Sequence, residues 1–297
     1  MSIAVNPVSI ARQLGVQTGL FPGEGLIVPS YRGGIFPCGM LFIFIQKIVH
    51  YQNKRNASRS IFWAIARRIA SSKFQTVRQK AAKKAEEQCA SGQFAAALFQ
   101  LQRAISLGHL PSRALMAWLL VDGREGVLKN YQEAFQLVDT GARLGCHHCQ
   151  GVLAYCYLGH GCEMGDIDFV RSLELASDSS ERGSKYGQCA LGDIYRVGFE
   201  RNYPKSVEFY LLAAAQGLDV AQLNLGSMHQ IGNVVAQNYA EALRLYQLAA
   251  DQGHPRALYF VGNFNEFGRG VPVDVKKANH WYKCALAAGF TFAKLKV

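Results

Sequence analysis

Acidic side chains are almost missing from the first 85 positions of the chain. This stretch holds 13 of the 32 lysines and arginines but only one of the 21 acids, Glu24, so it carries a net charge of +12. The remainder has 19 basic and 20 acidic residues by subtraction, a net charge of −1. Two physically different segments therefore join near residue 85, and only the first has a bulk attraction to anionic surfaces.

Long apolar runs are also scarce. The run over residues 35–45 falls short of the roughly 20 apolar residues that span a bilayer, and it starts too late in the chain for a conventional signal peptide. The spacing of the eight cysteines is not that of a small disulfide-stapled domain. A reducing, cytoplasmic compartment is favoured, with organellar targeting or peripheral membrane association as alternatives.

Signatures of catalysis are absent from the sequence as well. It has no serine in a nucleophile-elbow context, no phosphate-binding loop and no His-Glu-x-x-His helix. We therefore expect a protein that is not an enzyme, with no cofactor and no small-molecule substrate.

The chain instead contains an internal repeat of about 36 residues. Leu225-Gly226 is matched 36 positions later by Val261-Gly262, and Gly253 is matched by Gly289. A fixed period of this length is typical of stacked helical repeats. In-phase copies lie near residues 112–148, 149–185, 186–219, 220–254 and 255–290, with a weaker one before them.

Each copy predicts a helix, a glycine-containing turn and a second helix. In one copy Gly232 is expected to end the first helix in the left-handed conformation, and Asn238 to cap the start of the second. Neither helix can bury its apolar stripe alone, so neighbouring pairs must stack. The sequence therefore predicts an all-α solenoid of five to six helix pairs. We divide the chain into a basic N-terminal segment (1–74), a degenerate first pair (75–111), the repeats (112–290) and a tail (291–297).

The repeat resembles a known family at its most regular positions. Val261-Gly262, Gly268-Arg269-Gly270-Val271 and Ala249-Ala250-Asp251-Gln252-Gly253-His254 follow the pattern of the SEL-one-like repeat, a relative of the tetratricopeptide repeat. The resemblance covers about residues 112–290. It implies a right-handed superhelix that acts as a scaffold or adaptor for protein partners, and it brings no catalytic residues.

A curved stack offers a long concave groove for a peptide or a partner helix. Polar residues in the otherwise apolar first helices are the candidates for partner binding, and the alternative is that they are solvated or capping side chains. These candidates are Asn224, His229, Asn263 and Glu266.

A cluster of cysteine and histidine residues occupies positions 146–162. Thiolates and imidazoles suit zinc, so one interpretation is a metal site formed by Cys146, His148, Cys149 and Cys162. A second Cys-x-x-Cys pair is missing, however. The alternative is a set of cysteines that pack between helices as small apolar residues. Disulfides in every repeat, as in cysteine-rich exported members of the family, are not expected because the other repeats lack a matching pair.

The basic N-terminal segment has three interpretations. It could be an organellar targeting region, a hydrophobic cap on the first helix pair, or an amphipathic element on an anionic membrane. Residues 61–69 predict one apolar helical face there. The candidate membrane contacts are Arg59, Arg67, Arg68 and Lys73. Nucleic acid is not an expected partner, because no stacking or groove-reading motif accompanies the charge.

Overall fold

The computed structural model describes residues 17–20, 27–30, 60–159, 167–198, 201–232 and 234–296, with side chains from residue 75 onward. It divides into two compact units, residues 1–67 and 68–297. The expected apolar run over 35–45, together with Arg59 and Cys162, lies outside the described residues.

The first unit contains a short antiparallel pair of strands, β1 (Gln17–Leu20) and β2 (Ile27–Ser30), in which Gln17 is paired with Ser30. The sequence predicts extended or irregular backbone here, and the pairing of the two segments was not foreseen. The long helix α3 (Ser60–Ala90) starts in this unit and includes the predicted helical stretch 61–69.

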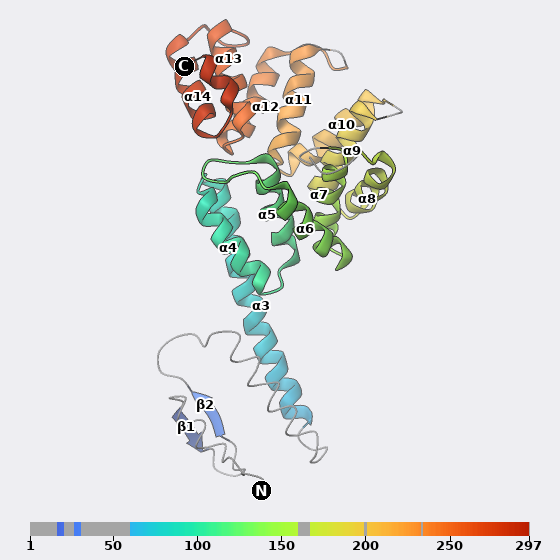
Figure 1. The fold of residues 1–297 in the computed structure, drawn as a ribbon, viewed down its shortest axis with the longest axis vertical. Coiled ribbons are helices and arrows are strands. Elements are labelled where there is room, and N and C mark those ends of the chain that lie inside the picture. Colours follow the sequence, from blue (N-terminus) through green and yellow to red (C-terminus); the bar gives the residue numbers. More distant parts are fainter. Residues whose placement is uncertain are drawn as a thin grey trace. The chain divides into compact units, whose positions relative to one another are not determined.

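The second unit is the predicted all-α solenoid, built from helices of similar length in hairpin pairs (Figure 1). Most helices have 13 residues because each copy of the repeat supplies the same two segments. Pairs α5–α6, α7–α8, α9–α10, α11–α12 and α13–α14 form the stack, and α3 with α4 precedes them. The bounds are α4 Phe94–Ser106, α5 Leu110–Asp122, α6 Tyr131–Arg143, α7 His147–Tyr157, α8 Phe169–Glu181, α9 Lys185–Val197, α10 Tyr203–Ala215, α11 Asp219–Ile231, α12 Tyr239–Asp251, α13 Pro255–Phe267, α14 Val275–Ala287 and a final 3₁₀ helix, Thr291–Leu295.

The second helix of every pair begins with the same cap. An asparagine or aspartate side chain accepts a hydrogen bond from the backbone N–H three residues later, which satisfies one of the donors left free at a helix start. The predicted cap Asn238 is confirmed, with the N–H of Glu241 as its donor at 3.0 Å. The equivalent caps are Asn130, Asp168, Asn202 and Asp274. The predicted left-handed end of α11 is also confirmed, since Gly232 has a φ of 77°.

A tyrosine ring of each regular second helix lies directly on a glycine of the preceding first helix. A Cβ atom built on Gly226 would lie 2.7 Å from the ring of Tyr246, and one built on Gly262 would lie 2.8 Å from the ring of Tyr282. Both tyrosines are almost completely buried. Only a residue without a side chain leaves room for the ring at this position. This explains why the glycine and the tyrosine recur together in successive repeats.

The buried hydroxyl groups of these tyrosines find polar acceptors on the first helix, as buried O–H groups must. Tyr246 donates to Gln230 Oε1 at 2.7 Å, and Tyr210 donates to Asp193 Oδ1 at 2.6 Å. Tyr282 donates to Glu266. In these three helix pairs the tyrosine hydroxyl thus links the two helices by hydrogen bonding inside an apolar contact.

Small residues separate one helix pair from the next. Ala249 near the end of α12 and Ala257 near the start of α13 are both fully buried. At the junction of α6 and α7 the equivalent positions carry Gly141 and Cys149, and a Cβ built on Gly141 would lie 2.3 Å from Cys149 Sγ. The larger cysteine is therefore accommodated by removal of a side chain on the facing helix, since the interior is close-packed.

Candidate binding groove and its surroundings

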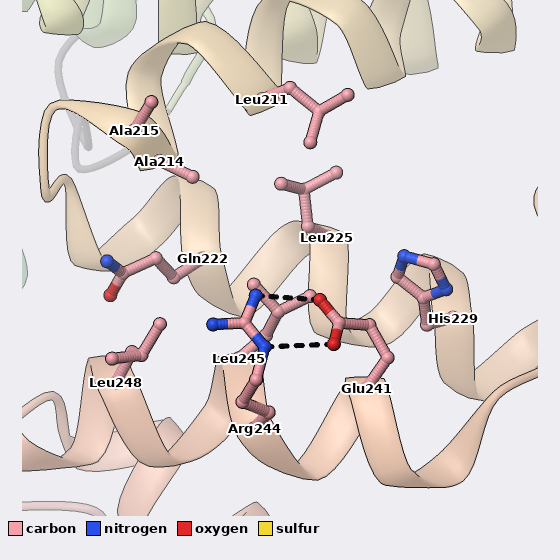
Figure 2. A pocket seen from close by; sticks show the side chains of 10 residues that line it. All are labelled: Leu211, Ala214, Ala215, Gln222, Leu225, His229, Glu241, Arg244, Leu245 and Leu248. Carbon is pink, nitrogen blue, oxygen red and sulfur yellow. Dashed lines mark hydrogen bonds and ion pairs between the residues drawn. The ribbon is translucent and has the colours of Figure 1, made fainter.

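A groove opens between two second helices, α10 and α12, with the first helix α11 as its floor (Figure 2). Its volume is about 300 Å³. Leu211 projects from α10 toward Leu225 on the floor, and Leu245 and Leu248 come from α12. Leu211 and Leu248 keep 53% and 39% of their surface exposed, so the groove presents apolar side chains to solvent. The rest of the lining is Ala214, Ala215, Gln222, His229, Glu241 and Arg244.

Charged and polar groups border this apolar surface. Arg244 donates two hydrogen bonds to Glu241, at 2.9 and 2.7 Å, and these bonds lower the pKa of the Glu241 carboxyl. His229 stands at one end of the groove, where its Nδ1 atom is buried without a hydrogen-bond partner among the described residues. A buried ring nitrogen without a partner costs free energy. It is therefore a group that a bound molecule can satisfy.

Of the predicted partner-binding residues, only His229 lines this groove. Asn224 lies half-buried on the same helix, α11. Glu266 is engaged within the chain, because it accepts from Tyr282 and pairs with Lys296 Nζ at 2.9 Å. Asn263 lies one turn away, beside Tyr282. The structure thus brings Asn263 and Glu266 together at the C-terminal end, apart from Asn224 and His229.

The leucines on the second helices were missed by the sequence reasoning. Leu211 belongs to an apolar helix in which the pattern does not show which leucines face a neighbour and which face solvent. The Glu241–Arg244 pair did carry a signal, since opposite charges three residues apart lie on one helix face.

A buried ion-pair network joins the turn after α5, the start of α11 and the cap of α13. Arg124, in the turn after α5, donates to Asp122 and to Asp219 at the start of α11, and its side chain is only 2% exposed. His254 Nε2 lies 3.4 Å from Asp122 Oδ2. Since His254 Nδ1 accepts the N–H of Ala257 to cap α13, the neutral ring carries its hydrogen on Nε2 and points it at Asp122. Arg124 holds the pKa of Asp122 low although burial opposes this, and burial lowers the pKa of His254.

Asp122, Asp219 and His254 bring potential metal-ligand atoms within 4.8 Å of one another, the one such group among the described residues. The Arg124 guanidinium already binds both carboxylates there. The charge that would attract a metal cation is thus neutralised by a side chain, so this network serves as an internal crosslink.

The junction of α3 and α4 lies against two turns of the stack. A Cβ atom built on Gly253 would lie 3.0 Å from the ring of Phe94, and one built on Gly126 would lie 3.5 Å from Ala95. Burial raises the pKa of Cys89 to about 11 at this junction, with Arg124 close enough to oppose the shift. The junction of α3 and α4 therefore packs against the turn after α5 and the turn before α13.

The predicted zinc ligands are only partly described. Cys146 and Cys149 stand one turn apart at the start of α7, and His148 Nδ1 lies 3.0 Å from Ser184 Oγ. Interaction with the Cys149 side chain lowers the pKa of Cys146 to about 6, and the backbone amides of residues 148 and 149 add to the effect. The same interaction raises the pKa of Cys149.

The predicted membrane contacts Arg67, Arg68 and Lys73 lie on α3, where only the backbone is described. Among the described residues, no helix combines the length and the apolarity that crossing a bilayer requires.

The geometry described above can be compared with that of known proteins. The hairpin pairs of near-constant length, stacked through a glycine–tyrosine contact, define an α/α solenoid. The Sel1 repeat model matches residues 111–146, 185–218, 219–254 and 255–290, so the chain contains four Sel1 repeats. Sel1-repeat solenoids commonly mediate protein–protein interactions and are generally non-enzymatic scaffolds.

Solved structures share similarity over much of the chain. The Sel1 repeat protein from Oxalobacter formigenes is 23% identical, with a TM-score of 0.48 over 71% of this chain and 86% of that one. The c5321 protective antigen of uropathogenic Escherichia coli is 24% identical, with a TM-score of 0.45 over 73% of this chain. This chain spans 50% of that protein. The immunity protein Pa5087 from Pseudomonas aeruginosa is 20% identical, with a TM-score of 0.44 over 72% of this chain and 81% of that one. No curated protein matches the sequence.

Proposed function

We propose that this protein is a non-enzymatic scaffold that binds a protein partner in the groove between α10 and α12. The observation that carries the proposal is the exposure of Leu211 and Leu248 on either side of a recess whose floor is apolar. Exposed apolar surface bordered by polar groups is typical of protein interaction sites. A partner that buries these leucines gains roughly 25 cal/mol for each Å² of apolar surface removed from water.

The lining indicates what kind of segment fits. A recess of about 300 Å³ accepts a few apolar side chains of a partner helix or an extended peptide, not a large cofactor. Glu241 and Arg244 already neutralise one another, so the rim does not select a strongly charged segment. The unpartnered Nδ1 of His229 calls for one hydrogen-bonding group near the end of the bound segment, a donor or an acceptor according to the tautomer of the ring.

The sequence predicts partner binding on the concave, first-helix side. The exposed leucines of the groove between the second helices α10 and α12 favour that groove as the anchor instead. A partner of greater length could extend from the groove to the first-helix side of α11 and α13, where Asn224 and Asn263 are half-buried.

The groove is tested by two neighbouring leucines on α10. Leu211 and Leu212 are 53% and 52% exposed, but only Leu211 lines the groove. The full chain and the variants Leu211→Glu and Leu212→Glu are used for affinity capture from the native cell, and each captured protein is then titrated in purified form. We expect Leu211→Glu to weaken binding at least about tenfold, which corresponds to about 1.4 kcal/mol, and Leu212→Glu to leave it intact. Equal binding by all three chains would refute the groove.

The alternative function is a membrane- or organelle-targeted regulatory subunit of a larger assembly, and it is supported by the charge of the N-terminal segment. Flotation on anionic liposomes with Arg67, Arg68 and Lys73 changed to glutamine tests it. Unchanged flotation would exclude these three contacts.

A further inference from the structure

Cys146 and Cys149 occupy the first turn of α7, where Cys146 is the residue before the helix and Cys149 is the third residue within it. With a rise of about 1.5 Å per residue and Cα atoms about 2.3 Å from the helix axis, two Cα atoms three residues apart in a helical turn lie about 5 Å apart. A disulfide requires a Cα separation of about 4.4–6.8 Å. The backbone therefore places these two thiols where an intramolecular disulfide can close without refolding the solenoid.

Packing alone does not require a thiol at either position. The residues equivalent to Cys149 in other repeats are Gly187, Ala221 and Ala257. Cys149 fits only because Gly141 faces it without a side chain. The equivalent junction of α12 and α13 is filled by a pair of buried alanines, Ala249 and Ala257. The sulfur atoms therefore need a chemical explanation.

Two arginines flank the thiols. Arg182 donates to the carbonyl of Gly145 at 3.1 Å, which fixes its guanidinium beside Cys146. Arg113 approaches from α5, and its Cδ would lie in ordinary van der Waals contact, at 3.5 Å, with a Cβ built on Gly141. Arg113 Nε is buried and has no hydrogen-bond partner among the described residues. Cationic surroundings at a helix start are those of reactive cysteines.

We propose that Cys146 and Cys149 form a reversible dithiol–disulfide pair that exchanges with low-molecular-weight disulfides such as glutathione disulfide. Cys146 acts first, because it is 5% exposed whereas Cys149 is fully buried. Its thiolate attacks one sulfur of glutathione disulfide, which forms a mixed disulfide and releases one glutathione thiolate. The Cys149 thiol then gives its proton to solvent, and its sulfur attacks Cys146 Sγ and expels the second glutathione.

The two electrons lost by the protein thiols reduce one glutathione disulfide to two glutathione molecules. Closure of the bond moves Cys149 Sγ from its contact with the Leu110 carbonyl, 3.6 Å away, and from Gly141. The pair thus modifies the junction between α6 and α7 without involving the groove at α10 and α12.

The test exposes the reduced full-length chain to glutathione disulfide, quenches it in acid and identifies the modified cysteines by alkylation and peptide mass spectrometry. Exposure alone predicts that Cys89 and Cys284, both half-buried, react before Cys146. We expect the opposite order, with the Cys146–Cys149 disulfide formed first and removed by dithiothreitol. Cys149→Ser should stop at the mixed disulfide on Cys146, whereas Cys156→Ser, a buried position on the same helix, should behave as wild type.

Two results would overturn the proposal. In the first, Cys146 and Cys149 stay reduced while Cys89 or Cys284 is modified. In the second, the gently purified chain contains stoichiometric zinc, and neither thiol reacts until that zinc is removed. This result would identify the pair as a metal site. The unfolded chain in urea shows in parallel that every cysteine is chemically competent.

Discussion

Arg124 and Asp219 form a buried ion pair although 95 residues separate them in the chain. Their side chains are 2% and 8% exposed, so the contact is closed to water. The turn after α5 is thereby tied to the start of α11, across the two helix pairs that lie between them in sequence.

Loss of this contact is expected to destabilise the protein strongly. Arg124→Ala leaves Asp122 and Asp219 without their buried partner, which costs about 3–5 kcal/mol in comparable networks. The free energy of unfolding in urea measures it. Arg244→Ala removes an exposed pair on α12 as a matched control and should cost no more than about 1 kcal/mol. Similar losses in the two variants would show that the Arg124 network does not crosslink the stack.

Acid is expected to weaken the fold through His254. Burial lowers its pKa in the folded chain, so the unfolded chain, with a histidine pKa near about 6.5, binds the proton first. Stability is therefore highest above that pH and falls below it, by up to about 1.4 kcal/mol per pH unit. The charged groups that face the ring are Asp122, Arg124, Asp219 and Arg256.

The variant His254→Asn isolates this effect, because asparagine also caps a helix but does not titrate. Unfolding free energies of both chains are measured between pH 7.5 and about 5.5, the window set by the histidine pKa. The difference between the two chains should be constant above neutrality and shrink as the pH falls. Parallel curves over the whole range would contradict a buried neutral His254.

Because the tyrosine ring lies on the glycine, we expect a methyl group added at that glycine to lower the free energy of unfolding. Gly226→Ala places a Cβ 2.7 Å from the Tyr246 ring, and overpacking of this kind costs about 1–3 kcal/mol although alanine favours helix. Thermal and urea unfolding measure it. Asn224→Ala, on the same helix, serves as control and should stay within about 0.5 kcal/mol. A stabilised Gly226→Ala variant would mean that the ring moves aside freely.

We expect a similar loss of stability when a large side chain is placed at the junction between α12 and α13. Ala249→Leu overfills a position with no exposed surface, with an expected loss of about 1–3 kcal/mol in urea unfolding. Ala287→Leu places the same side chain at an exposed position of α14. If the two variants unfold alike, the buried contact does not limit the spacing of the repeats.

The repeat architecture followed from the sequence because its signals are local and periodic. Asn238 and Gly232 mark a helix start and a helix end by their own backbone chemistry, and the 36-residue period places every other copy. The contact of Gly226 with Tyr246 was also encoded, since both recur together, but periodicity does not reveal which side chain a glycine faces.

The candidate site was less accessible to prediction. His229 was identified as a polar residue in an apolar helix, whereas Leu211 was not, because an exposed leucine and a buried leucine look the same in a helical pattern. The pairing of Arg124 with Asp219 depends on how far each helix pair rotates relative to the last. The small rotations between successive pairs accumulate along the stack, and no local sequence motif indicates the total rotation.

The reach of Arg124 sets a limit on how this protein can evolve. Open arrays of repeats grow or shrink by whole units, because each unit touches only its neighbours. Here, duplication or deletion of one unit between residues 146 and 219 would separate Asp219 from Arg124 and leave a buried charge without a partner. The number of repeats in that interval is therefore fixed by a single guanidinium group.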